Sequence, residues 1–163
     1  MTKIRIMLKA KSETLHLLIH ISLGILSALI IYNAFPATKI GGLISLGIAG
    51  NTLPDLDHVI YFLTYGKKTE YSTMVKSLIS AKQISELRKF LRQNHKYLTG
   101  LYSHTLLSPI VTSLLSFLFY KRGNPYLLAL FLSISTHFIY DIIEDLLFFG
   151  KLNRNWYFKL KKY

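Results

Sequence analysis

The 163-residue chain contains no cysteine, and it has only eight aspartates and glutamates against 20 lysines and arginines. The absence of cysteine excludes a disulfide framework and a thiolate metal site. Any metal must therefore be held by histidine, carboxylate or other oxygen ligands. The shortage of acidic residues gives a net charge of +12, which fits nucleic acid or an anionic membrane surface as a partner. The length is that of one domain, so we expect a single domain over 1–163.

Apolar residues make up half of the chain, and the mean hydropathy is positive at +0.33. They gather in four runs, which predict an all-α fold, a polytopic membrane helical bundle of about four spans. The second run is long enough to cross a bilayer only if it continues past Pro54 and Asp57. A signal peptide is disfavoured for the first run, because that run is longer than a signal core and holds two histidines. The runs cover 15–35, 40–53, 101–120 and 126–149, and the second reaches residue 62 if it continues.

The polar middle of the chain, residues 66–100, contains apolar residues at three- and four-residue steps from Met74 to Phe90. This periodicity predicts an amphipathic helix with a basic face. Two placements fit that helix equally well. It lies on the anionic lipid surface of the membrane, or it is a solvated helix that caps the bundle.

The distribution of basic residues predicts the orientation in the membrane. With a cytoplasmic N-terminus, the segments 1–14, 66–100 and 150–163 face the cytoplasm and hold 4, 8 and 5 Lys and Arg. The two outer turns then hold only three. The positive-inside rule favours this arrangement, which places both termini in the cytoplasm and the chain in the inner (plasma) membrane.

Ionisable residues recur at the cytoplasmic end of every predicted span. Positions four apart share a helix face, so the pairs His16/His20 and His137/Asp141 can each present two ligands to one ion. Asp55 and Asp57 can flank a cation where Pro54 interrupts the helical pattern. Ionisable groups inside spans are costly unless they meet a partner. We therefore expect these groups to converge on one metal site, with Zn as the first choice and Mn or Fe as alternatives.

Each of these residues also has a structural interpretation without metal. His16 fits an interfacial histidine and His95 a surface one, while His58 fits a group that orients a ligand as well as it fits a ligand. His104, inside Ser103-His104-Thr105 at the start of a span, fits a site residue better. Glu144 and Asp145 are expected to be solvated near the membrane face, or paired with lysines of the tail.

Four motifs in order resemble the bacterial and archaeal membrane-bound metal-dependent hydrolases. They are His20-x-x-x-Gly24, Pro54-Asp55-Leu56-Asp57-His58, Ser103-His104-Thr105-Leu106-Leu107 and His137-x-x-x-Asp141. The family consists of inner-membrane hydrolases, one described as LexA-regulated, and is distantly similar to zinc-dependent phospholipase C. The resemblance covers residues 16–141. It implies a metal site formed by His20, Asp55, Asp57, His58, His104, His137 and Asp141, with His16 and His95 as further candidates.

The chain departs from the family pattern at Thr99, which stands where the family has a histidine ahead of the third span. His95 lies one helical turn upstream and is the residue that can substitute for it. The departure puts catalytic competence in question, although it leaves the expected fold unchanged.

Together, these features predict a metal-dependent hydrolase at the cytoplasmic membrane face that acts on a phosphoester or phospholipid headgroup. Asp55 or Asp57 is the expected general base, and the basic middle segment the expected contact with anionic headgroups. The alternative is a non-catalytic metal-binding membrane protein, either a transporter or a scaffold. No nucleic-acid partner is expected, because the apolar runs are too long and no recognition motif is present. The sequence does not indicate an oligomeric state.

Overall fold

The structure is a computed structural model that describes residues 3–98 and 101–157, and all regular structure among them is helical. The expected all-α class is confirmed. The chain divides at Pro54/Asp55, at Thr105/Leu106 and at Leu152/Asn153 into two compact units. Unit 1 holds the part before Asp55 together with 106–152, and unit 2 holds 55–105 and the end of the chain. The expectation of a single domain stays a prediction.

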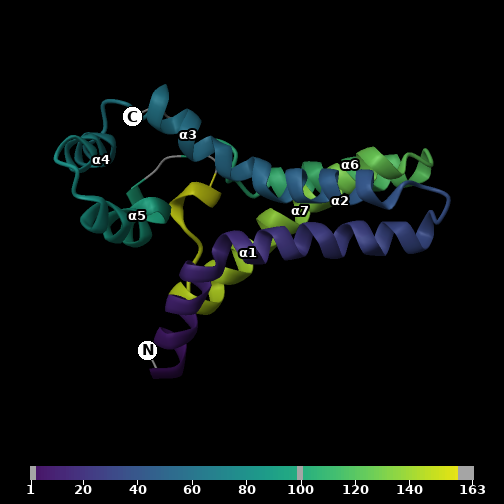
Figure 1. Cartoon of the computed structure of the whole chain (residues 1–163), viewed down its shortest axis with the longest axis horizontal. Coiled ribbons are helices and arrows are strands. Elements are labelled where there is room, and N and C mark those ends of the chain that lie inside the picture. The colour runs from purple at the N-terminus through teal and green to yellow at the C-terminus, as the bar shows by residue number, and fades with distance from the viewer. Residues whose placement is uncertain (1–2, 99–100, 158–163) are drawn as a thin grey trace. The chain divides into compact units, whose positions relative to one another are not determined.

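Unit 1 is a bundle in which α7 contacts each of the other helices. Its core contains Ala28, Ile31, Leu43, Leu128 and Ala129. Two of its segments, 14–34 and 125–148, are long and apolar enough to cross a membrane. The helices of unit 1 are α1 (Lys3–Ala34), α2 (Ile40–Thr52), α6 (Leu107–Lys121) and α7 (Pro125–Glu144), which continues as the π-helical turn η2 (Asp145–Phe149) (Figure 1).

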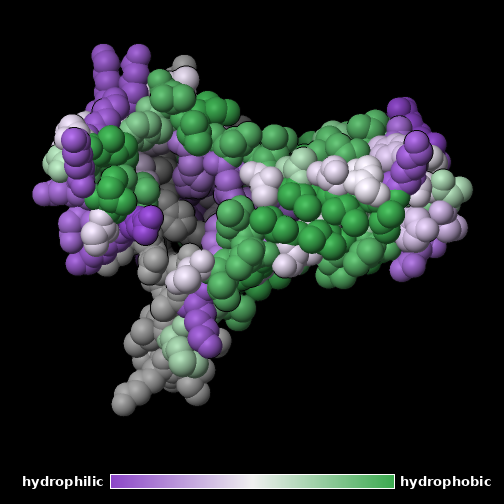
Figure 2. Space-filling view, viewed as in Figure 1, coloured by the Kyte–Doolittle hydropathy of each residue, from purple (hydrophilic) through white to green (hydrophobic). Residues whose placement is uncertain are grey.

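The outer surface of unit 1 is apolar. Leu17, Ile30, Leu114 and Phe117 are each more than half exposed, and Figure 2 shows apolar side chains over much of the visible face of these helices. Exposed apolar surface of this extent is unfavourable in water and typical of helices surrounded by lipid. The surface thus fits membrane insertion.

Two of the four expected spans are shorter in the structure than the sequence predicted. The 13 residues of α2 extend about 20 Å at 1.5 Å per residue, against a hydrocarbon core of about 30 Å. The chain then passes through a 3₁₀ turn, η1 (Leu53–Asp55), that contains Pro54. The third run begins with irregular chain, and α6 starts only at Leu107. Four complete spans therefore stay a prediction.

Unit 2 is built from shorter helices around Tyr61, Tyr71, Val75 and Leu101. These helices are α3 (Leu56–Leu63), α4 (Glu70–Ser80), α5 (Ile84–Leu98) and the 3₁₀ turn η3 (Arg154–Trp156).

The single amphipathic helix expected from Met74 to Phe90 is wrong, because the structure ends α4 at Ser80 and begins α5 at Ile84. Lys82 has a positive φ of 55°, its N–H bonds the carbonyl of Ile79, and the N–H of Gln83 bonds that of Leu78. These two bonds form a Schellman motif, which normally has glycine where Lys82 stands. Neither a glycine nor a proline marks this break in the sequence.

Glycines allow α1 and α2 to meet backbone against backbone. A Cβ added at Gly47 would lie 2.3 Å from the carbonyl oxygen of Gly24, and one added at Gly24 would lie 2.5 Å from that of Gly47. Gly24 lies one helical turn after His20, and Gly47 lies one turn before Asn51. The close approach therefore occurs next to the polar residues described below.

We predict that Gly47→Ala lowers the free energy of unfolding by about 1–3 kcal/mol, because the added methyl group meets backbone that cannot move aside. Thermal unfolding of the detergent-purified protein measures the change. Gly41→Ala is the matched control, since nothing lies within 4 Å of a Cβ at that position. Equal melting temperatures for the two variants would contradict the close packing of α1 on α2.

Candidate metal centre

The strongest cluster of potential ligands lies inside unit 1, between α1 and α7. His20 and His137 are fully buried, and Asp141 is 5% exposed. One ligand atom from each of the three lies within 4.8 Å of the others. His20 Nε2 is 3.8 Å from Asp141 Oδ1, and His137 Nε2 is 3.6 Å from Asp141 Oδ2. The structure thus brings together three of the residues that the sequence nominated.

Asn51, near the end of α2, fixes the orientation of both imidazole rings. Its side-chain Oδ1 lies 2.7 Å from His20 Nδ1, and its backbone oxygen lies 2.7 Å from His137 Nδ1. The Asn51 amide nitrogen donates to Ser133 O at 2.8 Å and to Thr136 Oγ1 at 2.9 Å, so Oδ1 must face His20. Both acceptors are carbonyl-type oxygens, and therefore both histidines carry their proton on Nδ1.

The Asn51 carbonyl is available to His137 because α2 ends at Thr52. The last carbonyls of a helix have no partner within that helix, and Pro54 follows without an N–H to extend the pattern. The helix end that Pro54 imposes thus supplies the acceptor that holds His137.

This arrangement fits a divalent metal. An Nδ1–H tautomer leaves Nε2 as the electron-pair donor, and metal-binding histidines normally donate their other N–H to an oxygen acceptor. His20 Nε2 makes no hydrogen bond with any described residue. The two imidazole rings are stacked with centroids 4.1 Å apart. Ligands on a tetrahedral zinc ion lie about 3.4 Å apart, close to the observed separations of 3.6 and 3.8 Å.

A second row of polar groups lies beside this cluster within unit 1. His16 sits one turn before His20 on α1, with ring centroids 4.3 Å apart. Ligand atoms of His16, Asp141 and Glu144 lie within 4.8 Å of one another. Glu144 is 4% exposed and Asp145 2% exposed, so the expectation of solvated side chains is wrong for both, and the alternative of pairing with lysines of the tail stays a prediction. Helix α7 reaches Glu144 and continues directly as η2, which places both carboxylates at buried positions.

Unit 2 contains a separate group built around His104. Asp57 Oδ2 accepts hydrogen bonds from Ser103 N at 2.9 Å and from Ser103 Oγ at 2.7 Å, and its Oδ1 accepts one from Tyr65 Oη at 2.8 Å. Since the Ser103 hydroxyl donates to Asp57, its oxygen accepts from His104 Nδ1 at 2.9 Å. His104 is thus also an Nδ1–H tautomer, with its ring 5.8 Å from that of His58.

The electrostatics of Asp57 follow from these contacts. Burial acts to raise the pKa of its carboxyl group, but the hydrogen bonds from Ser103 and Tyr65 outweigh burial and lower the pKa below its usual value. Burial, together with the same Asp57 contact, raises the pKa of Tyr65. An Asp57 carboxylate stabilised in this way is a weaker proton acceptor than an ordinary one. Its bonds instead suit it to orient Ser103 and His104, and its role as general base stays a prediction.

The remaining sequence candidates are placed as follows. Asp55 ends η1 and is half-buried. His95 belongs to α5, but its side chain lies outside the described residues, as does Thr99. The His104 group and the His20 group belong to different units, so their convergence on one metal site stays a prediction.

Asn51 and Glu144 were not among the site residues expected from the sequence. A signal existed for Asn51, since a lone amide within an apolar run is costly to bury unless it is hydrogen-bonded. Glu144 was missed because its position near the end of the apolar run suggested exposure to solvent. Its spacing from His137 and Asp141, at steps of four and three residues, was the available signal.

Comparison with known protein families gives a match over most of the chain. A family model described as YdjM inner membrane protein matches residues 15–146. This range includes His16, His20 and Glu144 as well as the motifs of unit 2. The chain matches neither a curated protein nor a solved structure.

We predict that Asn51→Ala destabilises the protein by about 1–3 kcal/mol for each buried group that loses its partner. It should also release the tautomer of His20. The histidine ¹⁵N NMR spectrum of the metal-free protein should then show mixed tautomers for His20 but not for His137, whose acceptor is backbone. Asn33→Ala, at an exposed position of α1, is the control. An unaltered His20 signal in Asn51→Ala would refute the role given to Asn51.

Proposed function

This chain belongs to the YdjM inner membrane protein family, and we propose that it is a metal-dependent hydrolase of the inner membrane. In this proposal, His20, His137 and Asp141 hold a divalent metal, with zinc as the first choice. The observation that carries the proposal is the buried cluster in which one residue, Asn51, ties down the Nδ1 of both histidines. Hydrogen bonds from the second ring nitrogen of a histidine to a neighbouring residue keep that histidine oriented as a metal ligand.

A divalent cation bound there supplies Lewis acidity and lowers the pKa of bound water. The protein's own residues orient the metal ligands and keep water away from them. Asn51 orients the two imidazoles, and burial of His20 and His137 keeps water from competing for their Nε2 atoms.

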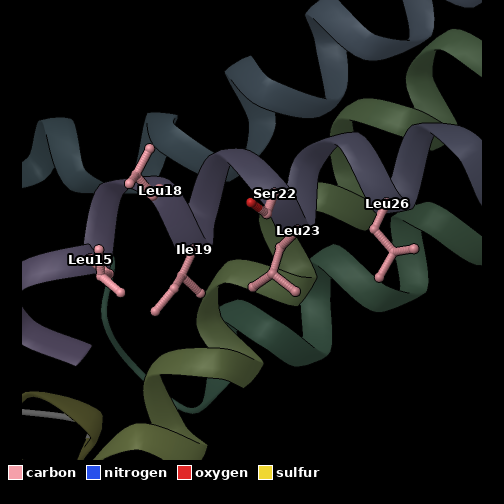
Figure 3. A pocket seen from close by; sticks show the side chains of 6 residues that line it. All are labelled: Leu15, Leu18, Ile19, Ser22, Leu23 and Leu26. Carbon is pink, nitrogen blue, oxygen red and sulfur yellow. The ribbon is translucent and has the colours of Figure 1, made fainter. Parts of the chain in front are cut away.

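A lipid phosphoester is the substrate class that we propose. An apolar groove runs along α1 in the stretch that also carries His16 and His20, and Figure 3 shows that Ser22 is the only polar residue lining it. An acyl chain fits such a surface, and the basic segments of the chain suit an anionic headgroup. The groove is lined by Leu15, Leu18, Ile19, Ser22, Leu23 and Leu26.

Multiple spans and cytoplasmic termini complete the proposal. The 17 basic residues assigned to the cytoplasmic side against three on the outer side support this orientation. The two long apolar segments support insertion. Tagging each terminus for access from either side of the membrane would test the orientation.

The metal proposal predicts at least one Zn, Mn or Fe per chain in detergent-purified protein, measured by elemental analysis. Asp141→Asn keeps the size of the side chain but removes the charge, so it should lose both the metal and hydrolysis of phospholipid vesicles. Glu86→Gln, at an exposed position of α5, should retain both.

Three other outcomes of this experiment are informative. Wild-type protein that binds no metal, even after reconstitution with each ion, would refute the proposal. Metal without hydrolysis of any phosphoester would favour the transporter or scaffold alternative. The same assay on Asp57→Asn tests convergence: loss of metal would join the His104 group to the site, and retained metal would confine the site to unit 1.

The lipid proposal predicts that Ser22→Trp, which fills the apolar groove, raises KM for long-chain phospholipid several-fold. Its kcat/KM for a short-chain soluble phosphodiester should stay unchanged, because the metal ligands are untouched. Leu29→Trp places the same side chain at another exposed position of α1 and serves as the control. Equal effects of Ser22→Trp on both substrates would argue against an acyl-chain groove.

A further inference from the structure

The polar residues between α1 and α7 are arranged as successive rungs of a ladder. Ser12, His16 and His20 follow one another at four-residue steps on α1, and His137, Asp141 and Glu144 follow at steps of four and three on α7. Such spacings place each set on one face of its helix. The innermost rung joins His20 to His137 and Asp141. The outermost rung joins Ser12 to Glu144 through a hydrogen bond from the Ser12 hydroxyl to Glu144 Oε1.

The middle rung has the composition of a metal site of its own. It contains one imidazole, from His16, and two carboxylates, from Asp141 and Glu144, with ligand atoms within 4.8 Å of one another. Both carboxylates are about 95% buried. Two carboxylates this close favour a cation that both can coordinate, because their like charges otherwise oppose ionisation.

The surroundings of the middle rung fix its carboxylate geometry. Ser12 is buried and orients Glu144, while Tyr140 Oη lies 3.0 Å from Ser12 Oγ and extends the contact across the helix pair. Asp141 belongs to both the inner and the middle rung. A carboxylate has two oxygens and can bridge two ions, the arrangement found in two-metal sites with ions about 3.5–4 Å apart.

We propose that His16, Asp141 and Glu144 form a second divalent-cation position, which shares Asp141 as a bridging ligand with the position at His20 and His137. The inference rests on the proposed metal site at His20, His137 and Asp141. It adds Glu144 as a ligand and gives His16 a defined role. The ligand set of one nitrogen and two carboxylates suits Mn or Fe as well as Zn, so the pair can hold two like ions or two different ones.

The test is metal stoichiometry of the full-length, detergent-purified protein reconstituted with Mn(II). Wild type is expected to bind two ions per chain and to give the electron paramagnetic resonance signal of an exchange-coupled pair. Glu144→Gln keeps an acceptor oxygen for Ser12 but removes the charge. It is expected to bind one ion, with the six-line signal of isolated Mn(II). Glu70→Gln, at an exposed position of α4, is the matched control and should bind two.

The remaining variants separate this inference from the function on which it rests. His16→Gln removes the imidazole of the middle rung, should also reduce the stoichiometry from two to one, and serves if Glu144→Gln does not fold. One ion in wild type that is lost in Asp141→Asn but retained in Glu144→Gln would overturn the second position and leave the first. No ion in wild type would overturn both. Two ions retained in both Glu144→Gln and His16→Gln would overturn the ligand assignment.

Discussion

The hydrogen bonds of Asn51 are the interaction on which unit 1 depends most. This one buried side chain, with its own backbone carbonyl, reaches α1 through His20 and α7 through His137, Ser133 and Thr136. Where lipid surrounds helices, apolar packing alone distinguishes poorly between neighbouring arrangements. A satisfied polar network inside the bundle supplies that distinction, because any rotation of α1 or α7 would break bonds that no water replaces.

Much of this architecture could be predicted from local sequence rules. The long apolar runs became α1 and α7, and Pro54 interrupts the second run where the missing N–H requires it. The pair His137/Asp141 lies together because four-residue spacing on a helix guarantees it. The family match confirms an inner-membrane protein family, and the metal-dependent hydrolase expected from the motifs stays a prediction. These successes all rest on patterns within one helix or on composition.

The features that were missed depend on contacts between helices. Asn51 lies in an apolar run, and its role comes from its hydrogen bonds with residues of α1 and α7. The run by itself does not indicate these bonds. Glu144 is buried by the neighbouring helix, although its position in the sequence suggests exposure. At the break between α4 and α5, Lys82 adopts a left-handed backbone conformation, which is unfavourable for lysine and is normally taken by glycine. The residue type therefore gives no sign of the break. Single-sequence rules do not reach such tertiary effects.

The glycine contact between α1 and α2 has a consequence for ion size. Gly24 and Gly47 touch through main-chain atoms, so no rotamer can widen or narrow the spacing of the two helices there. His20 and Asn51 lie one turn away from this contact on their helices, so the distance between them follows from the same spacing of the two helices. The gap between His20 and Asn51 is thereby set by the van der Waals radii of peptide groups, and Asn51 in turn holds the His20 ring. In the proposed metal site, a His20 ring held this rigidly would select divalent cations by ionic radius more than by ligand hardness.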